Sequence, residues 1–368
     1  MSYKTFIRPL LDRLDSETWH ARVKELMRAC EVSAHTLRLL EFASSGGRRI
    51  LDERLRVKVG GVSFENPLVV GAGWDKTCRA VRALYAIGFA GVEVGSVVER
   101  PQNGNPKPRQ FMITPDVCIN SLGLNSPGMD EVFRNLTRYG RLDIPVGINL
   151  GINSDVSHED APHAYAAVAR RFCDNASYFT INVSSPNTPG LRKLQGRIHL
   201  EAIVQAVREA LGDSSAGERS LFVKISPDLA PGAVDDVLRV VTDFGLSGVI
   251  ATNTTSRAAV KAKYGVKWRD VPGGVSGNDF EYRSLSTSVV SHIYRTTGGK
   301  VDIIGSGGVC DTASVLEKLR AGAKAVQIVT GLRGEGLSVA NSINRGLLEF
   351  MDKNGISDIS EITGSDHR

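Results

Sequence analysis

The residues best suited to chemistry form the segment 182–190, which reads Asn-Val-Ser-Ser-Pro-Asn-Thr-Pro-Gly. It follows the apolar run 178–181, which has the composition of a buried strand, so its polar groups lie where a strand ends. Two prolines fix the backbone and prevent a helical turn from following directly, which indicates a rigid loop. The amides of Asn182 and Asn187 can donate and accept hydrogen bonds, and the hydroxyl of Ser185 could move a proton. These groups suit a small, planar, amide-rich substrate; a polar turn that caps the next helix is the alternative.

The elements that position this loop follow a regular rhythm. Apolar runs recur from residue 68 onward, and most neighbouring runs are separated by a segment with helical periodicity, such as 200–211, 233–244 and 312–321. Strands that alternate with helices pair in parallel, and eight such units close into a (β/α)8 TIM barrel. A doubly wound open sheet is the alternative, but the first unit lacks a dinucleotide-binding glycine fingerprint. The eight predicted strands are 68–71, 91–94, 146–150, 179–183, 221–225, 248–251, 301–304 and 325–329.

The first fifty residues have a different pattern. Apolar residues recur at helical spacing from Trp19 to Cys30, and a second helical stretch follows at 35–42. Ser-Ser-Gly-Gly at 44–47 then predicts a linker, and alternating residues on either side of Gly60-Gly61 predict a hairpin of 55–59 and 62–64. We therefore divide the chain into an N-terminal helical extension, residues 1–50, and an α/β barrel, residues 51–368. The extension could be a packing arm, a docking flap or a membrane-surface patch.

Composition narrows the function classes. The chain has 368 residues, of which 42% are hydrophobic and 23% charged, as is typical of a globular protein. The net charge of +5 is scattered rather than striped, so we expect no nucleic-acid partner. Five cysteines without metal spacing favour a reducing compartment over a disulfide scaffold, and the dispersed histidines predict no metal site. No G-x-S-x-G motif is present, which disfavours a Ser-His-Asp hydrolase. No apolar run approaches the length of a membrane span, and the N-terminus does not resemble a secretory signal.

In a barrel of this type, functional groups stand at the C-terminal ends of the strands. Glycines at 305–308 and Thr330-Gly331 follow the seventh and eighth strands, where backbone N–H groups commonly hold a phosphate; two tight turns are the alternative. Lys224 ends the fifth strand and could place positive charge against a ring that becomes anionic on reduction, such as a flavin. Lys76 could reach the same ring or the substrate, although both lysines could instead form salt bridges. Asp75 is the one acid expected at this rim.

Four segments in order resemble dihydroorotate dehydrogenase, and the resemblance runs in register from the N-terminal helices to the C-terminus. Serine rather than cysteine at position 185, together with the helical extension, is similar to the membrane-associated, quinone-linked class 2 of that family. The four segments are Gly-Ala-Gly-Trp-Asp-Lys at 71–76, Arg-Pro-Gln-Asn-Gly-Asn-Pro-Lys-Pro-Arg at 100–109, the loop 182–190, and Ile-Ala-Thr-Asn-Thr-Thr at 250–255.

The resemblance implies oxidation of dihydroorotate to orotate in de novo pyrimidine (UMP) biosynthesis, with FMN in the barrel mouth and a quinone as acceptor. It implies that Ser185 is the catalytic base, assisted by a water relay near Thr188, and that Lys224 stabilises the reduced flavin. It also implies that electrons pass to the quinone through a tunnel between the N-terminal helices and the flavin edge. A cytoplasmic protein bound peripherally to the inner membrane through these helices is expected. The implied FMN contacts are Ala72, Gly73, Lys76, Ser96, Asn149, Asn182, Lys224, Thr252, Gly277, Gly308, Val329 and Thr330. The implied substrate contacts are Lys76, Asn120, Ser121, Leu122, Gly123, Leu124, Asn182, Asn187, Asn253 and Thr254.

Several positions depart from the quinone-linked pattern. Met112 and Val329 stand where this class usually has arginine and tyrosine, and both of those normally contact the quinone head. Leu124 replaces a phenylalanine and Ser121 an arginine, so the segment around them looks more like the soluble class 1. One interpretation is a divergent class 2 enzyme that binds quinone mainly by shape. The other is an FMN-dependent paralogue with a different substrate or acceptor, for instance an ene-reductase. Retention of the four substrate asparagines favours the first. A flavin-binding regulator and a non-flavin phosphate-binding barrel are more distant alternatives.

Overall fold

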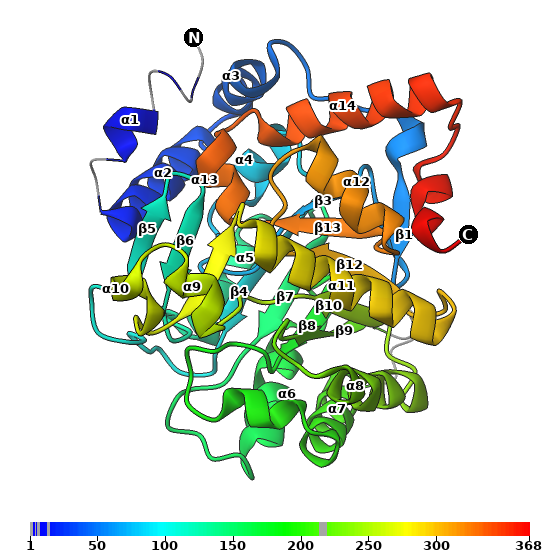
Figure 1. Ribbon diagram of the computed structural model, residues 1–368. Coiled ribbons are helices and arrows are strands. Elements are labelled where there is room, and N and C mark those ends of the chain that lie inside the picture. The colour runs from blue at the N-terminus through cyan, green and yellow to red at the C-terminus, as the bar shows by residue number, and fades with distance from the viewer. Residues whose placement is uncertain (1–2, 4, 6–7, 13–14, 213–218) are drawn as a thin grey trace.

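The computed structural model describes residues 3, 5, 8–12, 15–212 and 219–368. Within these residues, eight parallel strands close a barrel in the order β10-β12-β13-β3-β4-β7-β8-β9 (Figure 1). The closed barrel confirms the predicted fold class and excludes the open sheet. All eight predicted strands are present: β3 Leu68–Val70, β4 Gly91–Val97, β7 Val146–Leu150, β8 Tyr178–Asn182, β9 Leu221–Ile225, β10 Gly248–Ala251, β12 Asp302–Ser306 and β13 Ala325–Ile328.

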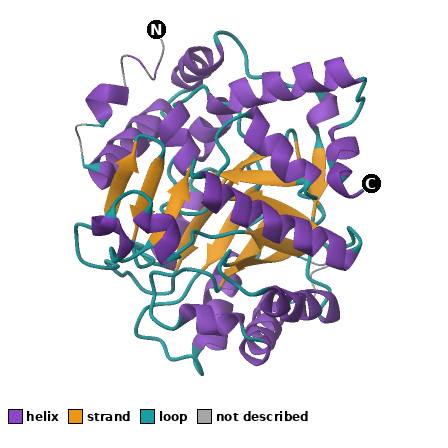
Figure 2. Cartoon of the chain, viewed as in Figure 1, coloured by secondary structure: helices purple, strands orange, loops and turns teal. Residues whose placement is uncertain are grey.

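Helices surround the barrel and cover the outer face of its strands (Figure 2). The three helices singled out in the sequence are confirmed as α7, α8 and α12. Local residues fix the ends of the helices: Asp311 caps the start of α12, and Gly298 ends α11 in the left-handed conformation. The covering helices are α4 Val81–Ala86, α5 Met129–Thr137, α6 Ala161–Phe172, α7 Arg197–Leu211, α8 Pro231–Asp243, α11 Phe280–Thr297, α12 Thr312–Arg320 and α14 Val339–Asn354. Three short helices lie in the connections: α9 Ala258–Ala262, α10 Val266–Arg269 and α13 Thr330–Glu335.

The barrel interior has an apolar end and a polar end. Val69, Tyr178, Phe222, Ile250 and Ile304 pack together at the N-terminal ends of the strands. The predicted hairpin is confirmed as β1 Val57–Val59 and β2 Val62–Phe64, and it contributes side chains to the same cluster. Packing therefore closes this end, and the polar residues collect toward the C-terminal ends of the strands.

The predicted N-terminal helices are confirmed as α2 Ser16–Cys30 and α3 Ala34–Ser45, with a short α1 Arg8–Leu11 before them. The predicted linker at 44–47 is wrong in its first half, because Ser44 and Ser45 still belong to α3 and Gly46 is its left-handed cap. Helix α2 packs on α4, and α3 packs on α4 and α14. Residues 1, 2, 4, 6, 7, 13 and 14 of the predicted extension lie outside the described residues. The division at residue 50 stays a prediction.

A three-stranded antiparallel sheet beside the barrel was not expected from the sequence. Its order is β11-β6-β5, with β5 Gln110–Thr114, β6 Val117–Asn120 and β11 Gly274–Gly277, and it lies at the left of Figure 1. Strand β5 is half-buried along its whole length, and β11 carries a glycine at each end, so neither shows the alternation that predicts a strand. This sheet matters for the site because it brings Asn120, at the end of β6, over the barrel mouth.

Candidate active site

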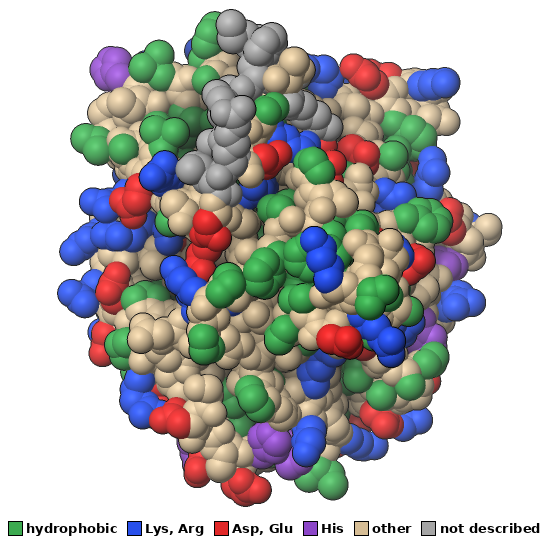
Figure 3. Space-filling view, turned by 60° about the vertical axis from the view of Figure 1, so that its left-hand side comes forward, with side chains coloured by type: hydrophobic (Ala, Val, Ile, Leu, Met, Phe, Trp, Pro, Cys, Tyr) green, Lys and Arg blue, Asp and Glu red, His purple; other side chains and the backbone are tan. Residues whose placement is uncertain are grey.

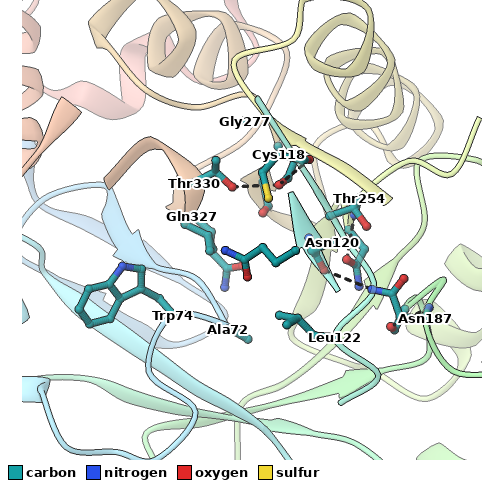
Figure 4. A pocket seen from close by; sticks show the side chains of 18 of the residues that line it. Ala72, Trp74, Cys118, Asn120, Leu122, Asn187, Thr254, Gly277, Gln327 and Thr330 are labelled. Atoms are coloured by element: carbon teal, nitrogen blue, oxygen red, sulfur yellow. Dashed lines mark hydrogen bonds between the residues drawn. The ribbon is translucent and has the colours of Figure 1, made fainter. Parts of the chain in front are cut away.

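A cavity opens at the C-terminal ends of the barrel strands. It contains about 1310 Å³ of empty space, including its open mouth. In Figure 4, Trp74 lies at one end, Asn120 and Asn187 lie at the other, and Gln327 stands between them. Most of the predicted site residues line this cavity: Ala72, Gly73, Lys76, Ser96, Asn120, Leu122, Gly123, Leu124, Asn182, Ser185, Asn187, Lys224, Thr252, Asn253, Thr254, Gly277, Gly308, Val329 and Thr330. Their roles remain predictions, but the fold brings them together.

The predicted residues Asn149 and Ser121 do not line the cavity. Asn149 is fully buried below it and accepts hydrogen bonds from Ser96 and from the Asn182 side chain, the latter at 3.2 Å. Ser121 turns its hydroxyl to the backbone carbonyl of Arg109 at 3.4 Å. Asn149 therefore supports two groups that face the cavity, whereas Ser121 contacts only the backbone of the neighbouring strand. Asp75 is not a rim acid either, because its buried carboxylate accepts backbone N–H groups of its own turn, from Arg79 at 2.8 Å and Ala80 at 2.9 Å.

The amide groups form one end of the cavity. The side chain of Asn187 donates to the side-chain oxygen of Asn120 at 3.2 Å, and the side chain of Asn253 donates to the Ser184 hydroxyl at 3.0 Å. The Asn187 side-chain oxygen and the Thr254 hydroxyl are buried and have no hydrogen-bond partner among the described residues. Buried polar groups are normally paired, so these two match a ligand that itself carries hydrogen-bonding groups.

Ser185 lies in this amide end and is 5% exposed. Its hydroxyl oxygen accepts the backbone N–H of Asn187 at 3.2 Å, which fixes its position in the proline-bounded loop. The Asn187 carbonyl oxygen in turn accepts from the Asn105 side chain at 3.1 Å. The Thr188 hydroxyl is buried and has no partner within the described part of the chain. The loop thus holds one hydroxyl at the cavity wall and a second, unsatisfied hydroxyl close behind it in sequence.

Two lysines reach into the cavity in different surroundings: Lys76 is half-buried and Lys224 is buried. Burial, followed by the positive charge of Arg109, lowers the pKa of Lys76 to about 7, and its ammonium donates to the Asn125 side chain. Burial also lowers the pKa of Lys224, but there the negative charge of Glu93 acts in the opposite direction. Lys224 donates to the side-chain oxygen of Gln327 at 3.0 Å. Lys76 therefore depends on an anionic ligand to stay charged above neutral pH, whereas Lys224 has an acid nearby.

Glycines shape the end of the cavity at β12 and β13. Gly307 and Gly308 have φ values of +113° and +76°, which side chains rarely adopt. A Cβ atom on Gly308 would come within 2.5 Å of the Arg283 side chain, so the backbone is close-packed from behind. Thr330 begins α13, and its hydroxyl donates to Ser276 at 3.0 Å. Backbone N–H groups that approach a cavity in this way suit a phosphate.

Helix α2 supplies a wall of the cavity, and the two residues that form it were not among the predicted site residues. Trp19 and His20 both line it, and His20 meets Trp74 edge to face with ring centroids 5.3 Å apart. Burial, and then the charges of nearby lysines, lower the pKa of His20 to about 4, so the imidazole is neutral at physiological pH. Trp19 belongs to an apolar helical pattern that is equally typical of packing, so the pattern alone did not mark it as a site residue. Other lining residues that were missed are Gln110, Cys118, Tyr282, Gln327 and Arg333.

Several known proteins are similar to this chain in sequence and in structure. A family model described as Dihydroorotate dehydrogenase matches residues 54–351. The dihydroorotate dehydrogenase (quinone) of Natronomonas pharaonis is 38% identical over 367 residues, covering 100% of both chains. That of Erythrobacter litoralis is 38% identical over 363 residues, covering 98% of this chain and 99% of the relative. The crystal structure of the Eimeria tenella enzyme in complex with ferulenol is similar with a TM-score of 0.78 and 34% identity, over 90% of this chain and 94% of that one. The ligand-free form of the Eimeria tenella enzyme gives a TM-score of 0.79 at 33% identity.

Proposed function

This chain belongs to the dihydroorotate dehydrogenase family, and on that premise we propose that it oxidises dihydroorotate to orotate in de novo pyrimidine biosynthesis, with FMN as cofactor and a quinone as acceptor. The observation that carries the proposal is one cavity with three chemically different parts. Ser185 and the asparagines line one part, the two lysines and the glycine-lined backbone of β12 and β13 line the second, and a wall of α2 forms the third. A substrate, a phosphate-bearing cofactor and an apolar acceptor each have a matching surface.

The residues in the middle of the cavity fit FMN. A Cβ on Gly73 would meet no atom within 4 Å, so the backbone there leaves open space beside a planar ring. Gly277, Gly307 and Gly308, all with positive φ, leave the backbone accessible to a phosphate. Lys224 supplies a cation to the ring, and Thr330 supplies a hydroxyl at the glycine end. When bound, FMN supplies the two-electron acceptor that amino-acid side chains lack.

The amide end suits dihydroorotate. Its ring amides can pair with the side chains of Asn120, Asn187 and Asn253, including the unsatisfied Asn187 oxygen. Its carboxylate would hold Lys76 in the charged form. Ser185 then accepts the proton that leaves the substrate ring. Among the described residues, the Ser185 hydroxyl has no hydrogen bond to a histidine, carboxylate or lysine, so the proton leaves through water, near the free Thr188 hydroxyl.

The α2 wall is the proposed acceptor site. Trp19 and His20 line this wall, and Met112 and Val329 add apolar surface to the same cavity. His20 is neutral, and the charged group at the wall is the Arg333 guanidinium over the Trp19 ring. Such a surface suits an uncharged quinone better than a nicotinamide dinucleotide. Because Met112 and Val329 offer no hydrogen bonds, a paralogue that uses another acceptor, or reduces an activated alkene, is the second candidate. The intact set of asparagines around Ser185 favours the first.

We propose that the N-terminal helices rest on the inner membrane as a peripheral contact. Leu26 of α2 is 62% exposed, and Leu39 and Phe42 of α3 are 68% and 63% exposed. On the side of the molecule that carries α2, hydrophobic side chains lie among basic ones (Figure 3). A surface of this composition suits an anionic lipid interface. Within the described residues, no helix has the length and apolar character needed to cross a bilayer.

The acceptor assignment is tested by following orotate formation from dihydroorotate with different oxidants. We expect turnover with a water-soluble quinone and little or none with NAD⁺ or fumarate. Orotate formation that is faster with NAD⁺ or fumarate would contradict the quinone assignment while leaving the substrate intact. Failure with every acceptor, in a protein that contains FMN, would instead support the paralogue. Reduction of activated alkenes by the same preparation would then identify the second candidate.

A further inference from the structure

A buried acid lies directly beneath the proposed cofactor site. Glu93 stands in the middle of β4, where every residue is buried, and has no exposed surface itself. Its carboxylate accepts hydrogen bonds from the side chains of Gln327 at 2.7 Å, Asn149 at 2.8 Å and Thr180 at 3.1 Å. It therefore joins three neighbouring parts of the barrel wall: β13, β7 and β8.

In these contacts the side chain of Glu93 acts as a carboxylate. Both amide partners offer NH₂ groups, which only donate, so both carboxylate oxygens act as acceptors. A charge in the barrel interior is costly unless it is compensated. The compensating cation is Lys224 of β9, which reaches Glu93 through the intervening Gln327. Tyr178 of β8 is the other titratable group beside Glu93, and burial and the charge of Glu93 raise its pKa, so it stays neutral.

The carboxylate also fixes which way two amides point. It takes the NH₂ end of Gln327, so the oxygen of that amide faces the Lys224 ammonium at 3.0 Å. It takes the NH₂ end of Asn149, so the Asn149 oxygen faces the side chains of Ser96 and Asn182. Lys224, Asn182 and Ser96 all line the cavity, whereas Glu93 does not. The Glu93 carboxylate thus fixes the donor-to-acceptor direction in two chains of hydrogen bonds, and both chains end at residues that line the cavity.

We propose that Glu93 is a positioning residue that keeps Lys224 charged through Gln327 and orients Asn182 through Asn149 toward the cofactor. The inference rests on the proposed function, because it requires FMN in the middle of the cavity. A fixed cation beside a ring that gains negative charge on reduction raises the reduction potential of that ring. The role of Glu93 is then to make this cation independent of pH over the physiological range.

The test is the pH dependence of the midpoint potential of bound FMN in Glu93→Gln. In the wild type we expect Lys224 to remain protonated in both redox states. A neutral amide at position 93 removes the opposing charge and presents an NH₂ group to Asn149 or Gln327, one of which must rotate. Lys224 then loses its proton near neutral pH and regains it on reduction. We expect up to one additional proton taken up with the two electrons between pH 6 and 9. We also expect about tenfold weaker FMN binding, the effect of one misdirected hydrogen bond.

Three further variants separate this role from general damage. Thr180→Val removes one donor to Glu93 but leaves the charge and both amides, so it should keep the wild-type profile. Glu93→Gln combined with Lys224→Met should lose the additional proton; this removes any ambiguity from Lys76, which shares the cavity and titrates near pH 7. Gln327→Met removes the amide that connects Glu93 to Lys224 and leaves the carboxylate intact. It should reproduce the additional proton uptake, and it tests the role independently if Glu93→Gln does not fold.

Specific outcomes overturn the inference. Wild-type proton uptake in both Glu93→Gln and Gln327→Met would show that Glu93 does not act on Lys224. Persistence of the additional proton after removal of Lys224 would assign it to another group. If Glu93→Gln does not fold, an unchanged profile in Gln327→Met is sufficient to reject the role. A wild-type protein that binds no FMN would overturn the proposed function and this inference together, whereas the other outcomes leave the proposed function standing.

Discussion

At the scale of single residues, the two cavity lysines show how surroundings assign different tasks to one side-chain type. Lys76 is half-buried near the cation Arg109, so it holds its proton weakly. Lys224 is more completely buried, but it is connected to the carboxylate of Glu93 through Gln327. The first therefore responds to a ligand's charge, whereas the second has a carboxylate nearby that favours its charged form. This contrast leads to a pH-dependent prediction for substrate binding.

We expect the KM for dihydroorotate to rise as the pH increases above 7. The pKa of Lys76 lies near 7, below its ordinary value, so the ligand-free protein loses the cation as the pH passes through 7. Above that pH the protonated fraction falls by about tenfold per unit, and affinity for the substrate carboxylate falls with it. Steady-state kinetics between pH 6 and 9 measure the effect. Lys76→Met should show a high KM that varies little with pH; a flat KM in the wild type would contradict the assignment.

Ser185→Ala should slow reduction of the flavin by dihydroorotate by about 10²–10⁴-fold while FMN stays bound, because a general base is removed and the cofactor surface is untouched. Rapid mixing under anaerobic conditions measures the rate. Ser185→Cys retains a group that can take the proton and should keep more activity, with its optimum shifted to lower pH because a thiol is more acidic than a hydroxyl. Unchanged reduction in the alanine variant, or loss of FMN from it, would refute the role of Ser185.

The sequence predicted those site residues that stand at strand ends, because the barrel rule says where functional groups collect. Asn182, Lys224 and Thr252 belong to this group, and all of them line the cavity. Glu93 and Gln327 were missed because each sits inside a run that otherwise reads as an apolar strand. A charged or amide side chain in such a run was the available signal, since it must find a partner in the barrel interior. The pairing itself depends on the register of neighbouring strands and could not be predicted.

At the scale of elements, α2 connects the extension to both ends of the cavity. Trp19 and His20 form the proposed acceptor wall, and Glu17 binds Arg109 at 2.6 Å. Arg109 in turn donates to the Asn105 backbone carbonyl at 2.8 Å, and Asn105 donates to the Asn187 backbone carbonyl at 3.1 Å. The same helix thus borders the acceptor and braces the substrate loop. Substitutions that face only the wall should separate the two half-reactions.

Trp19→Leu should raise the KM for a quinone several-fold and leave the rate of flavin reduction by dihydroorotate unchanged. The indole is 4% exposed and lies under the Arg333 guanidinium, 4.8 Å from its ring centre, so a smaller side chain reshapes the wall without reaching Ser185. Leu26→Ala, on the exposed side of the same helix, is the matched control and should behave as wild type. Equal losses in both half-reactions would mean that the wall serves stability alone.

A second element-scale prediction concerns the membrane. Replacing Leu39 and Phe42 of α3 together with aspartate should weaken binding to anionic phospholipid vesicles by more than about tenfold, since two apolar side chains no longer enter the interface. Flavin reduction by dihydroorotate should not change. Ile198→Asp with Phe280→Asp is the control pair, because these residues are 82% and 71% exposed on other helices. Vesicle flotation measures binding, and equal binding by both double variants would place the lipid contact elsewhere.

The elements that were predicted correctly are those with a regular pattern of apolar residues. This pattern is present in helices α2 and α3, in the eight barrel strands and in the hairpin around Gly60-Gly61. The sheet of β5, β6 and β11 does not show it, because β5 is half-buried along its length and β11 comes from a distant part of the chain. Asn120 was assigned to the substrate from the resemblance alone, and it is this sheet that carries it to the barrel mouth.

At the scale of the whole molecule, the barrel is closed at one end and chemically active at the other. Apolar side chains of the barrel and the β1–β2 hairpin fill the N-terminal end. The polar residues that are hydrogen-bonded to Glu93 lie between this cluster and the cavity at the other end. The extension adds an acceptor wall and an exposed apolar surface beside that opening. Electrons would therefore enter from the substrate at one end of the cavity and leave toward the membrane-facing end.

The most direct measurement is anaerobic mixing of the purified yellow protein with dihydroorotate, followed through the long-wavelength absorbance of its flavin. We predict rapid bleaching, because the asparagines, Lys76 and Ser185 are assembled around one substrate position beside the cofactor site. Absence of bleaching, with dithionite still able to reduce the flavin, would contradict dihydroorotate as the substrate. It would point instead to a cavity retuned around Leu124 for another compound.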